Sequence, residues 1–368
     1  MNMKFNKTLM IIILSIISVS SYSQDPLYTQ FYFNAIYTNP SLAGSNHNGT
    51  RFIANQRNQW HKIPGMLSTS SISVDMNFIR ESNIGLFFYE DYEGEQFLSQ
   101  SGGYLNLSGF LNLSRTISFR YGTKIGFYQK KINWDKFVFY DQLDPFYGNI
   151  ASSNIPVASS FSTEPIFDWT IGGAIFYAPK KGGKDGIHMI GAITEHVVTF
   201  KETFYDNEYK IPLIVSFHYN SLIPTKSNSD ILYNPYFRWT FDIAKPTDIK
   251  PIESKNQFQN IDLGLNLFVG SLTFGMGGKF AFYERTSKNI NHGVLLIGWT
   301  NYAKNFMVSY SHDFPISGVP TSTVTTSELN LILFINGNIF PRIGVFKKYG
   351  GSNKCEDFYR RGKTVVIW

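Results

Sequence analysis

Apolar and polar positions alternate along most of this chain. In the stretch NIDLGLNLFVG, residues 260–270, the odd-numbered positions from 261 to 269 are Ile, Leu, Leu, Leu and Val, with polar or small residues between most of them. Similar alternation recurs at 71–78, 105–113, 119–127, 211–219 and 329–335. A period of two indicates β-strands with one apolar face, and no stretch shows a comparable pattern at the helical period.

The alternating stretches predict about fourteen strands, and most of them are long. A strand needs roughly 9 to 11 residues to cross a bilayer at a tilt, whereas strands of soluble proteins usually have about 5 to 6 residues. An even number of strands is the rule for single-chain barrels of the bacterial outer membrane. The predicted strands cover residues 50–60, 67–79, 82–92, 99–113, 115–132, 167–178, 186–200, 210–220, 230–243, 257–269, 272–285, 291–301, 303–312 and 324–335.

The predicted connections between strands alternate in length. If the first strand starts in the periplasm, the outside connections include 133–166 and 244–256, while the inside ones include tight turns at 80–81 and 270–271. Outer-membrane barrels have short periplasmic turns and longer outside loops. The pattern therefore favours an all-β fold, a transmembrane antiparallel β-barrel, and a solvent-exposed β-sandwich is the alternative.

Composition supports a membrane barrel. Aromatic residues make up 17% of the chain and charged residues 16%, against about a quarter charged in an ordinary soluble protein. We expect the leucine face of 261–269 to contact lipid and aromatic side chains near strand ends to lie at the headgroup level. We expect a polar set to face the lumen, namely Asp75, Asn77, Arg120, Lys124, Asp262 and Asn266.

The N-terminus predicts export. A basic start and an apolar run over residues 9–19 precede the small residues Ser21 and Ser23, which is the pattern of a signal peptide cut before Gln24. An uncleaved N-terminal anchor is the alternative. The expected organisation is a signal peptide (1–23), an N-terminal segment (24–49), an outer-membrane barrel (50–335) and a short periplasmic C-terminal tail (336–368).

The formal charge of +6 is concentrated in the predicted tail. Seven basic residues stand against two acidic ones between 336 and 368, so the charge does not indicate a nucleic-acid partner. The tail is expected to meet an acidic protein or phospholipid headgroups, or to be solvated. The single cysteine, Cys355, excludes an intramolecular disulfide.

The segment QDPLYTQFYFNAIYTNPSLAGS, which precedes the first strand, is aromatic and needs a place to be buried. Asn39 is suited to cap a turn, Pro40 to take its first helical position and Gly44 to end it. The composition predicts a plug under or in the lumen; a frayed N-terminus is the alternative.

The connection 133–166 is the longest between predicted strands. Connections of this length are uncommon and usually functional. Its aromatic residues suit a protein-binding surface, and an inward fold that narrows the lumen is the alternative. The candidate binding residues are Trp134, Phe137, Phe139, Tyr140, Phe146 and Tyr147.

The sequence carries no persuasive enzymatic motif. It lacks the His-Glu-x-x-His metal spacing, the Gly-x-Ser-x-Gly elbow and the Walker loop, and GMGGKF at 275–280 lies inside a strand pattern. We therefore expect no enzyme, no cofactor and no metal site. Two rivals remain: a hydrolase with a site at the edge of the lumen, and a porin-like channel for small solutes lined by Asp75, Arg120, Lys124 and Asp262.

Several motifs resemble one family. The segment QDPLYTQFYFNAIYTNPSLAGS, the stretch RNQWHKIPGMLSTSSISVD with Arg57, Asn58, Gln59 and Trp60, and the closing YSHDFPIS with SELNLILF resemble PorP/SprF proteins of the type IX secretion and gliding apparatus of Bacteroidota. The chain departs from the family where His-Glu-Ile is usual and Ser327, Glu328 and Leu329 stand here.

This resemblance implies an integral outer-membrane barrel without enzymatic activity. Many members receive one large secreted protein through its type B C-terminal domain and anchor it at the cell surface, and gliding adhesins are such partners. Other members connect the outer membrane to periplasmic, peptidoglycan-bound parts of the secretion machinery. The expected partners are a secreted protein of this kind, other type IX components, a peptidoglycan-binding protein and outer-membrane lipid.

Overall fold

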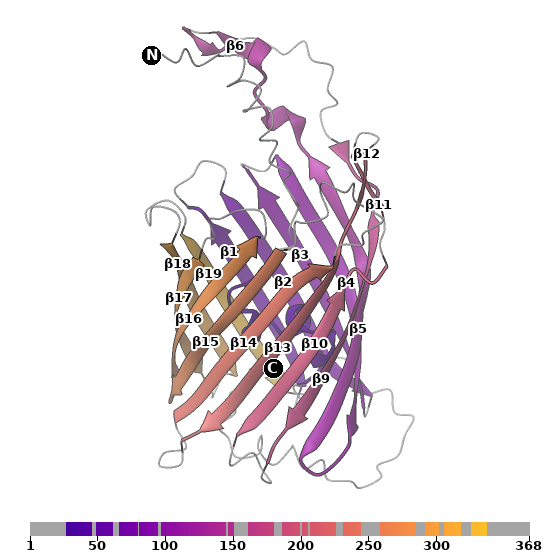
Figure 1. The fold of residues 1–368 in the computed structure, drawn as a ribbon, viewed down its shortest axis with the longest axis vertical. Helices are drawn as coiled ribbons and strands as arrows, with labels where there is room; N and C mark the ends of the chain where they lie inside the picture. The colour runs from indigo at the N-terminus through magenta and orange to yellow at the C-terminus, as the bar shows by residue number, and fades with distance from the viewer. Residues whose placement is uncertain are drawn as a thin grey trace, which may run out of the picture.

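The chain forms a closed antiparallel β-barrel of 14 strands in a computed structural model (Figure 1). The structure describes residues 27–45, 49–61, 66–79, 81–94, 97–144, 146–150, 161–179, 186–198, 201–204, 207–225, 231–243, 258–283, 291–301, 305–317 and 325–336. The predicted signal peptide, nearly all of the predicted tail with Cys355, and the connection 244–256 lie outside these residues.

The fourteen barrel strands follow one another around the wall in chain order. They are β1 (Gly49–Gln59), β2 (Leu67–Ile79), β3 (Ser82–Glu93), β4 (Leu98–Asn112), β5 (Ile117–Ile132), β9 (Ile166–Tyr177), β10 (Ile187–Glu195), β13 (Leu213–Pro224), β14 (Ile231–Ile243), β15 (Phe258–Val269), β16 (Leu272–Tyr283), β17 (Asn291–Asn301), β18 (Phe306–Ser317) and β19 (Thr326–Asn336).

Short elements occur outside the wall. Before β1 lie η1 (Phe31–Phe33), α2 (Ala35–Thr38) and η2 (Pro40–Leu42). The connection from β5 to β9 contains η3 (Trp134–Lys136), η4 (Tyr140–Gln142) and the short strands β6 (Leu143–Asp144), β7 (Gly148–Asn149) and β8 (Phe161–Ser162), and the hairpin β11 (Lys201–Phe204) with β12 (Asn207–Lys210) lies between β10 and β13. None of the described helices is long and apolar enough to span a membrane.

The first and last barrel strands close the wall. β1 pairs with β19 from Gly49↔Asn336 to Gln59↔Thr326, and it pairs with β2 on its other side. Closure satisfies the backbone donors and acceptors that an open sheet would leave at its two edges. A sheet of this kind is therefore able to lie in lipid, where water does not compensate unpaired backbone groups.

The predicted number of strands is confirmed, and most predicted bounds lie within two residues of the observed ones. The predicted strand 186–200 is too long, because His196 has a left-handed φ of 57° and ends the extended conformation. The predicted strand 210–220 is too short at its C-terminal end, because pairing with β14 continues to Ile223↔Tyr233 and Pro224↔Leu232.

The barrel has an apolar outer face and a polar inner face. Large apolar side chains that alternate along the strands are exposed on the outside, and the residues between them are buried in the lumen. This is the alternation that lipid on one side and a polar lumen on the other require. Examples of the exposed set are Ile72, Phe88, Leu107, Phe127, Ile190, Leu263, Phe274, Leu295, Ile297 and Leu331.

The two ends of the barrel differ. One end carries the connections β1–β2, β3–β4 and β5–β9, and we call it the loop end; the other carries the short turns β2–β3, β4–β5 and β15–β16, and we call it the turn end. Outward aromatic groups gather towards both ends, with Phe217, Trp239 and Phe241 at the loop end and the stacked rings of Tyr177, His188 and Tyr219 at the turn end. Two such bands are the usual girdles of a membrane barrel.

The outer face predicts how stability depends on depth in the membrane. Leu263 lies near the middle of β15, so Leu263→Arg places a charge near the bilayer centre and is expected to lower the free energy of unfolding by about 2 to 4 kcal/mol. Val269 ends the same strand, and Val269→Arg is expected to cost only about 0 to 1 kcal/mol. Urea unfolding of the folded protein in lipid vesicles, followed by tryptophan fluorescence, measures both values; equal losses would contradict the depths assigned to the two residues.

Candidate functional site

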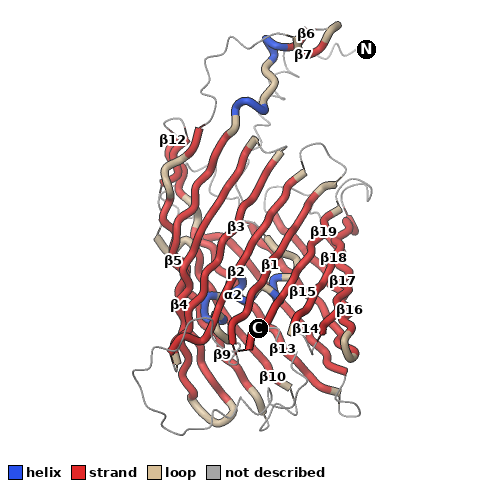
Figure 2. Tube along the Cα trace, turned by 180° about the vertical axis from the view of Figure 1, so that it is seen from behind, coloured by secondary structure: helices blue, strands red, loops and turns tan. Residues whose placement is uncertain are grey.

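The N-terminal residues 27–45 lie inside the barrel, and we call them the lumen segment (Figure 2). From Tyr28 to Ser45, every side chain except that of Tyr37 is buried. Phe31, Phe33, Ile36 and Leu42 pack against inward groups of the wall such as Met189 and Ile332. An aromatic sequence before the first strand is therefore buried in the lumen, in three short helical turns.

The three residues predicted to shape this segment lie at its turn-end half. Asn39 is the N-cap of η2, and its side-chain Oδ1 accepts a hydrogen bond from the backbone N–H of Ser41 at 2.9 Å. Pro40 is the first residue of η2. Gly44 has a left-handed φ of 60°, and its N–H donates to Asp75 Oδ2 at 2.6 Å.

Glycines in the wall make room for the lumen segment. A Cβ atom on Gly122 of β5 would lie 2.6 Å from the carbonyl carbon of Pro40, and one on Gly172 of β9 would lie 2.2 Å from Asn39 Oδ1. Both separations are shorter than any side chain tolerates. The backbone of the segment and that of the wall therefore approach each other more closely than larger residues allow.

A buried ion pair holds the turn-end half of the segment. Arg51 of β1 and Asp75 of β2 form two hydrogen bonds, of 3.0 Å from Nε and 2.7 Å from Nη2. The same Arg51 Nη2 donates to the carbonyl of Leu42 at 3.2 Å, and Asp75 accepts from Gly44. Because both charges are fully buried, losing either partner would leave an uncompensated charge, which costs about 3 to 5 kcal/mol.

Other wall groups bond to further residues along the segment. Asn39 Nδ2 lies 2.9 Å from His218 Nε2 of β13 and donates to the carbonyl of Gly173 on β9 at 3.1 Å. Arg238 of β14 pairs with Asp262 of β15 at 2.7 Å, donates to the carbonyl of Tyr28 and lies 4.0 Å above the ring of Phe31. These strands lie across the barrel from β1 and β2, which hold the segment through Arg51 and Asp75, so strands on opposite sides of the barrel contact one short peptide.

The six residues predicted to face the lumen are all buried, and each contacts other protein groups. Asp75 and Asp262 pair with arginines as above. Asn77 donates to Asn83, and Asn266 donates to Asn234. Arg120 lies between the rings of Phe110 and Phe176, and Lys124 pairs with Glu195 at 3.3 Å and lies over the ring of Tyr104.

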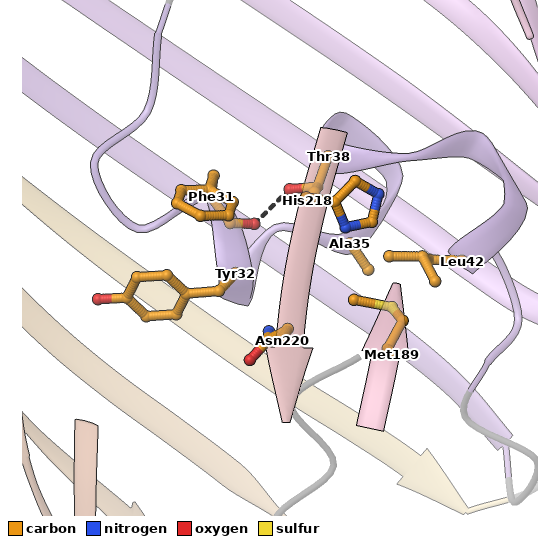
Figure 3. Close-up of a pocket in the computed structure, with 8 residues that line it drawn as sticks. All are labelled: Phe31, Tyr32, Ala35, Thr38, Leu42, Met189, His218 and Asn220. Carbon is orange, nitrogen blue, oxygen red and sulfur yellow. Dashed lines mark hydrogen bonds between the residues drawn. The ribbon is translucent and has the colours of Figure 1, made fainter. Parts of the chain in front are cut away.

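A small cavity lies between the lumen segment and the wall (Figure 3). Its volume is about 10 Å³, and Met189, His218 and Asn220 line it from the wall while η1, α2 and Leu42 line it from the segment. This volume is close to the least that holds one water molecule, so the cavity has no room for an organic ligand. Among the described residues, no group of three or more His, Cys, Asp or Glu side chains is placed to hold a metal ion.

The long β5–β9 connection separates the predicted aromatic residues into two groups. Trp134, Phe137 and Phe139 pack on one another and on Phe97, with ring centroids 5.0 Å apart for Phe97 and Phe137 and 5.1 Å apart for Trp134 and Phe137. We call these four residues the stalk. The described part of the connection extends away from the barrel above the stalk and does not fold into the lumen (Figure 1).

Beyond the stalk the connection exposes apolar side chains, and we call Leu143, Phe146, Tyr147 and Ile150 the tip. Phe146 is 92% exposed and Tyr147 79% exposed. Asp144 Oδ1 accepts hydrogen bonds from the backbone N–H groups of both residues, at 2.8 and 2.9 Å, which holds the turn that presents them. Tyr140 is the first residue of η4, and its side chain lies outside the described part of the chain.

The motif Arg57, Asn58, Gln59 and Trp60 ends β1 at the loop end. Arg57 points into the lumen, 4.0 Å from Asp313, while Asn58 accepts hydrogen bonds from Gln56 and Ser68. Trp60 has a left-handed φ of 62°, and its N–H donates to the carbonyl of Thr325. The motif thus orders one corner of the barrel and contributes Arg57 to the lumen.

Comparisons with solved structures find other membrane barrels. The CymD monoaromatic hydrocarbon channel shares 9% identity over 82% of this chain and 93% of its own, with a TM-score of 0.47. The Pseudomonas putida toluene transporter TodX shares 8% identity over 81% and 91%, with a TM-score of 0.44, and a Pseudomonas aeruginosa FadL homologue shares 8% over 78% and 89%, also at 0.44. Similarity this low tells nothing about the function of the chain.

No curated protein matches the sequence. A model of one protein family does match, over residues 20–333, and its description is type IX secretion system membrane protein PorP/SprF. The match covers the lumen segment and nearly all of the barrel wall. The chain therefore belongs to the PorP/SprF family of type IX secretion system membrane proteins.

Proposed function

We propose that this barrel anchors a secreted surface protein at the cell surface, by binding the partner's type B C-terminal domain with the tip of the β5–β9 connection. The supporting observation is the near-complete exposure of Phe146 and Tyr147 on a connection that rises above the loop end (Figure 1). Membership in a type IX secretion family gives the class of partner. The loop end is then the extracellular end of a barrel integral to the outer membrane.

The chemistry of the tip favours a protein partner. Aromatic residues are enriched at binding interfaces, and a few of them usually supply most of the binding free energy. The stalk separates the tip from the barrel wall, so a lipid contact does not account for its exposed rings. The ring packing of Trp134, Phe137 and Phe139 also orders the base of the connection before binding, which lowers the entropy cost of association.

A closed lumen is the second part of the proposal. Residues 27–45 occupy the interior, and the cavity beside them has room for about one water molecule. The porin-like alternative requires Asp75, Arg120, Lys124 and Asp262 to line water, and each of these side chains contacts other side chains instead. The third alternative, a link to periplasmic peptidoglycan-bound parts, depends on the tail at 336–368, nearly all of which lies outside the described residues.

The tip predicts where the partner binds. Phe146→Ala combined with Tyr147→Ala is expected to abolish co-purification of a large surface protein with the tagged barrel from native outer membranes, because each central aromatic anchor is worth about 2 kcal/mol or more. The partner bound to the unaltered protein is identified by mass spectrometry, and its bound amount is compared between variants.

Leu113→Ala provides the matched control. Leu113 is also a large exposed apolar residue, 65% exposed, but it lies at the turn end. The control is expected to retain the partner in full. Full retention by the tip variant, or recovery of periplasmic peptidoglycan-binding proteins alone from the unaltered barrel, would contradict surface anchoring through the tip.

A closed lumen predicts that the protein does not conduct ions. The purified full-length protein is expected to insert into planar bilayers without a steady conductance, because the lumen segment bonds to wall groups on both sides of the barrel. The folded state of the purified barrel is verified separately by its heat-dependent shift in electrophoretic mobility. A large, steady conductance would support the porin-like function instead.

A further inference from the structure

Two residues at the start of the lumen segment, Thr29 and Gln30, are bound almost entirely by side chains of the wall. The groups that contact them come from β16, β18 and β19. Glu328 is near the first residue of β19 and Asp313 is near the last residues of β18, so this part of the segment lies in the loop-end half of the lumen. Thr29 and Glu328 are 299 positions apart in the sequence.

Glu328 binds the backbone of the segment. Its Oε2 accepts a hydrogen bond from the N–H of Thr29 at 2.6 Å, and its Oε1 accepts one from the N–H of Gln30 at 3.1 Å. Asn55 of β1 donates to the same Oε1 at 2.8 Å and orients the carboxylate. A carboxylate that accepts two consecutive backbone N–H groups recognises an irregular peptide whose donors are otherwise unused.

The side chains of both residues are bound as well. Thr29 Oγ1 donates to Asp313 Oδ2 at 2.6 Å and accepts from Lys279 Nζ at 3.1 Å. Gln30 Nε2 donates to Ser311 Oγ at 3.1 Å and to the carbonyl of Glu328 at 2.9 Å, and its Oε1 accepts from Ser309 Oγ at 2.5 Å. Every polar atom of these two side chains therefore has a wall partner.

The neighbouring residues are bound by Arg238. Its Nη2 donates to the carbonyl of Tyr28 at 3.2 Å, and its guanidinium lies 4.0 Å from the ring centroid of Phe31, within the range of a cation–π contact. Asp262 holds the guanidinium from the other side. Four consecutive residues, Tyr28 to Phe31, are thus recognised one by one.

The wall around the segment carries buried polar groups as well as the apolar groups that pack on the segment. Asn106 and Asn330 are fully buried, and within the described part of the protein neither atom of either side-chain amide has a hydrogen-bond partner. Ser73 and Thr273 have buried hydroxyl groups that likewise lack a hydrogen-bond partner among the described residues. Groups of this kind are normally satisfied by water. Water would satisfy these polar groups in a lumen that the segment had left.

The direction of the segment determines which part is able to leave. Its turn-end part is joined to β1 through the three residues 46–48, while its loop-end part, at Tyr28, is far from that junction. At the loop end, the contacts of Thr29 and Gln30 are hydrogen bonds to polar and charged side chains, each of which an aqueous solution replaces at modest net cost. Separation is therefore easiest from the loop end.

We propose that the loop-end half of the lumen is a peptide-binding site, and that its ligand is the sequence Tyr-Thr-Gln-Phe at residues 28–31 of the same chain. The lumen segment acts as a ligand that detaches from the wall at its loop end and leaves a water-filled pore. This inference rests on the proposed closure of the lumen. It adds that closure is reversible and that named wall groups control it.

The test supplies the ligand as a separate molecule. A variant lacking residues 27–45 is inserted into planar bilayers, where it is expected to conduct, and a synthetic peptide with the sequence of residues 27–45 is expected to block that conductance. A peptide with Thr29→Val and Gln30→Leu keeps the approximate size of both side chains and loses their hydrogen bonds. Half-maximal block by this peptide is expected to need at least a roughly 10-fold higher concentration.

A peptide with Ser41→Ala is the matched control. Ser41 is fully buried, but its Oγ has no hydrogen-bond partner among the described residues, so the control peptide is expected to block as well as the unaltered one. Equal block by the Thr29→Val, Gln30→Leu peptide would overturn the proposal. A folded deletion variant that stays silent would also overturn it.

A second variant covers the case in which the deletion variant does not fold. Full-length protein with Glu328→Gln and Asp313→Asn keeps the size of both side chains and weakens the bonds to Thr29 and Gln30. It is expected to show intermittent openings, whereas Thr273→Val, which removes a wall hydroxyl without a partner, is expected to stay silent. Silence of the double variant would overturn the proposal.

The outcomes separate the two proposals about the lumen. A steady conductance of the unaltered protein contradicts closure itself. A silent unaltered protein with a conducting deletion variant that no peptide blocks leaves closure intact and contradicts only the peptide-binding site. Neither result bears on the tip, which is tested by partner binding.

Discussion

Charged side chains buried in the lumen need partners within the protein, because a buried charge without a partner is costly. The chain meets this requirement with pairs between neighbouring strands, such as Arg51 with Asp75 and Arg238 with Asp262. Each arginine then donates a further bond to a backbone carbonyl of the lumen segment. The position of the segment thus follows from how the wall satisfies its own charges.

The same requirement explains the sequence of the segment. A helix-rich plug with an apolar surface would leave the Glu328 carboxylate without the two backbone donors that it has here, at Thr29 and Gln30. Thr29 and Gln30 instead present backbone N–H groups that irregular structure leaves free. Directly after Gln30 the segment turns into short helices, beginning with η1 at Phe31, whose apolar side chains pack on Met189 and Ile332. Polar recognition at the loop end and apolar packing further along therefore coexist in nineteen residues, 27–45.

The barrel itself was predictable from sequence, because a period of two with lipid on one side repeats in every strand. Strand ends were less predictable where a single residue, such as His196 with its left-handed φ, interrupts the extended backbone. The partners of the lumen segment were not predictable: Thr29 and Glu328 are 299 positions apart, and neither has a local pattern that indicates the other. Arg51, Arg238, Asp313 and Glu328 look like ordinary polar residues of alternating strands, and only the closed barrel places each of them against the lumen segment.

The β5–β9 connection shows a different limit on what the sequence predicts. Its six aromatic residues look equivalent in the sequence, yet those of the stalk are used for packing and Phe146 and Tyr147 are left exposed. The sequence does contain one signal for this division, since Asp144 stands two and three residues before the exposed pair, as in an Asx turn. The aromatic residues around the stalk precede that turn and have a partner in Phe97 from the neighbouring connection.

The anchoring role proposed above requires that a load pass from the bound protein to the membrane, and the strand pairing at the base of the connection suits this requirement. β5 is 16 residues long, and the short strand β8 extends its pairing beyond β9 through Lys131↔Ser162 and Ile132↔Phe161. Thr163 adds bonds to Lys130, with its N–H donating at 2.9 Å and its Oγ1 accepting at 3.0 Å. Because these bonds continue the ladder of the wall, force on the connection is shared by strands that lipid surrounds. A binding loop joined to the barrel by flexible chain alone would transmit the same force through single backbone bonds and would reorient under it.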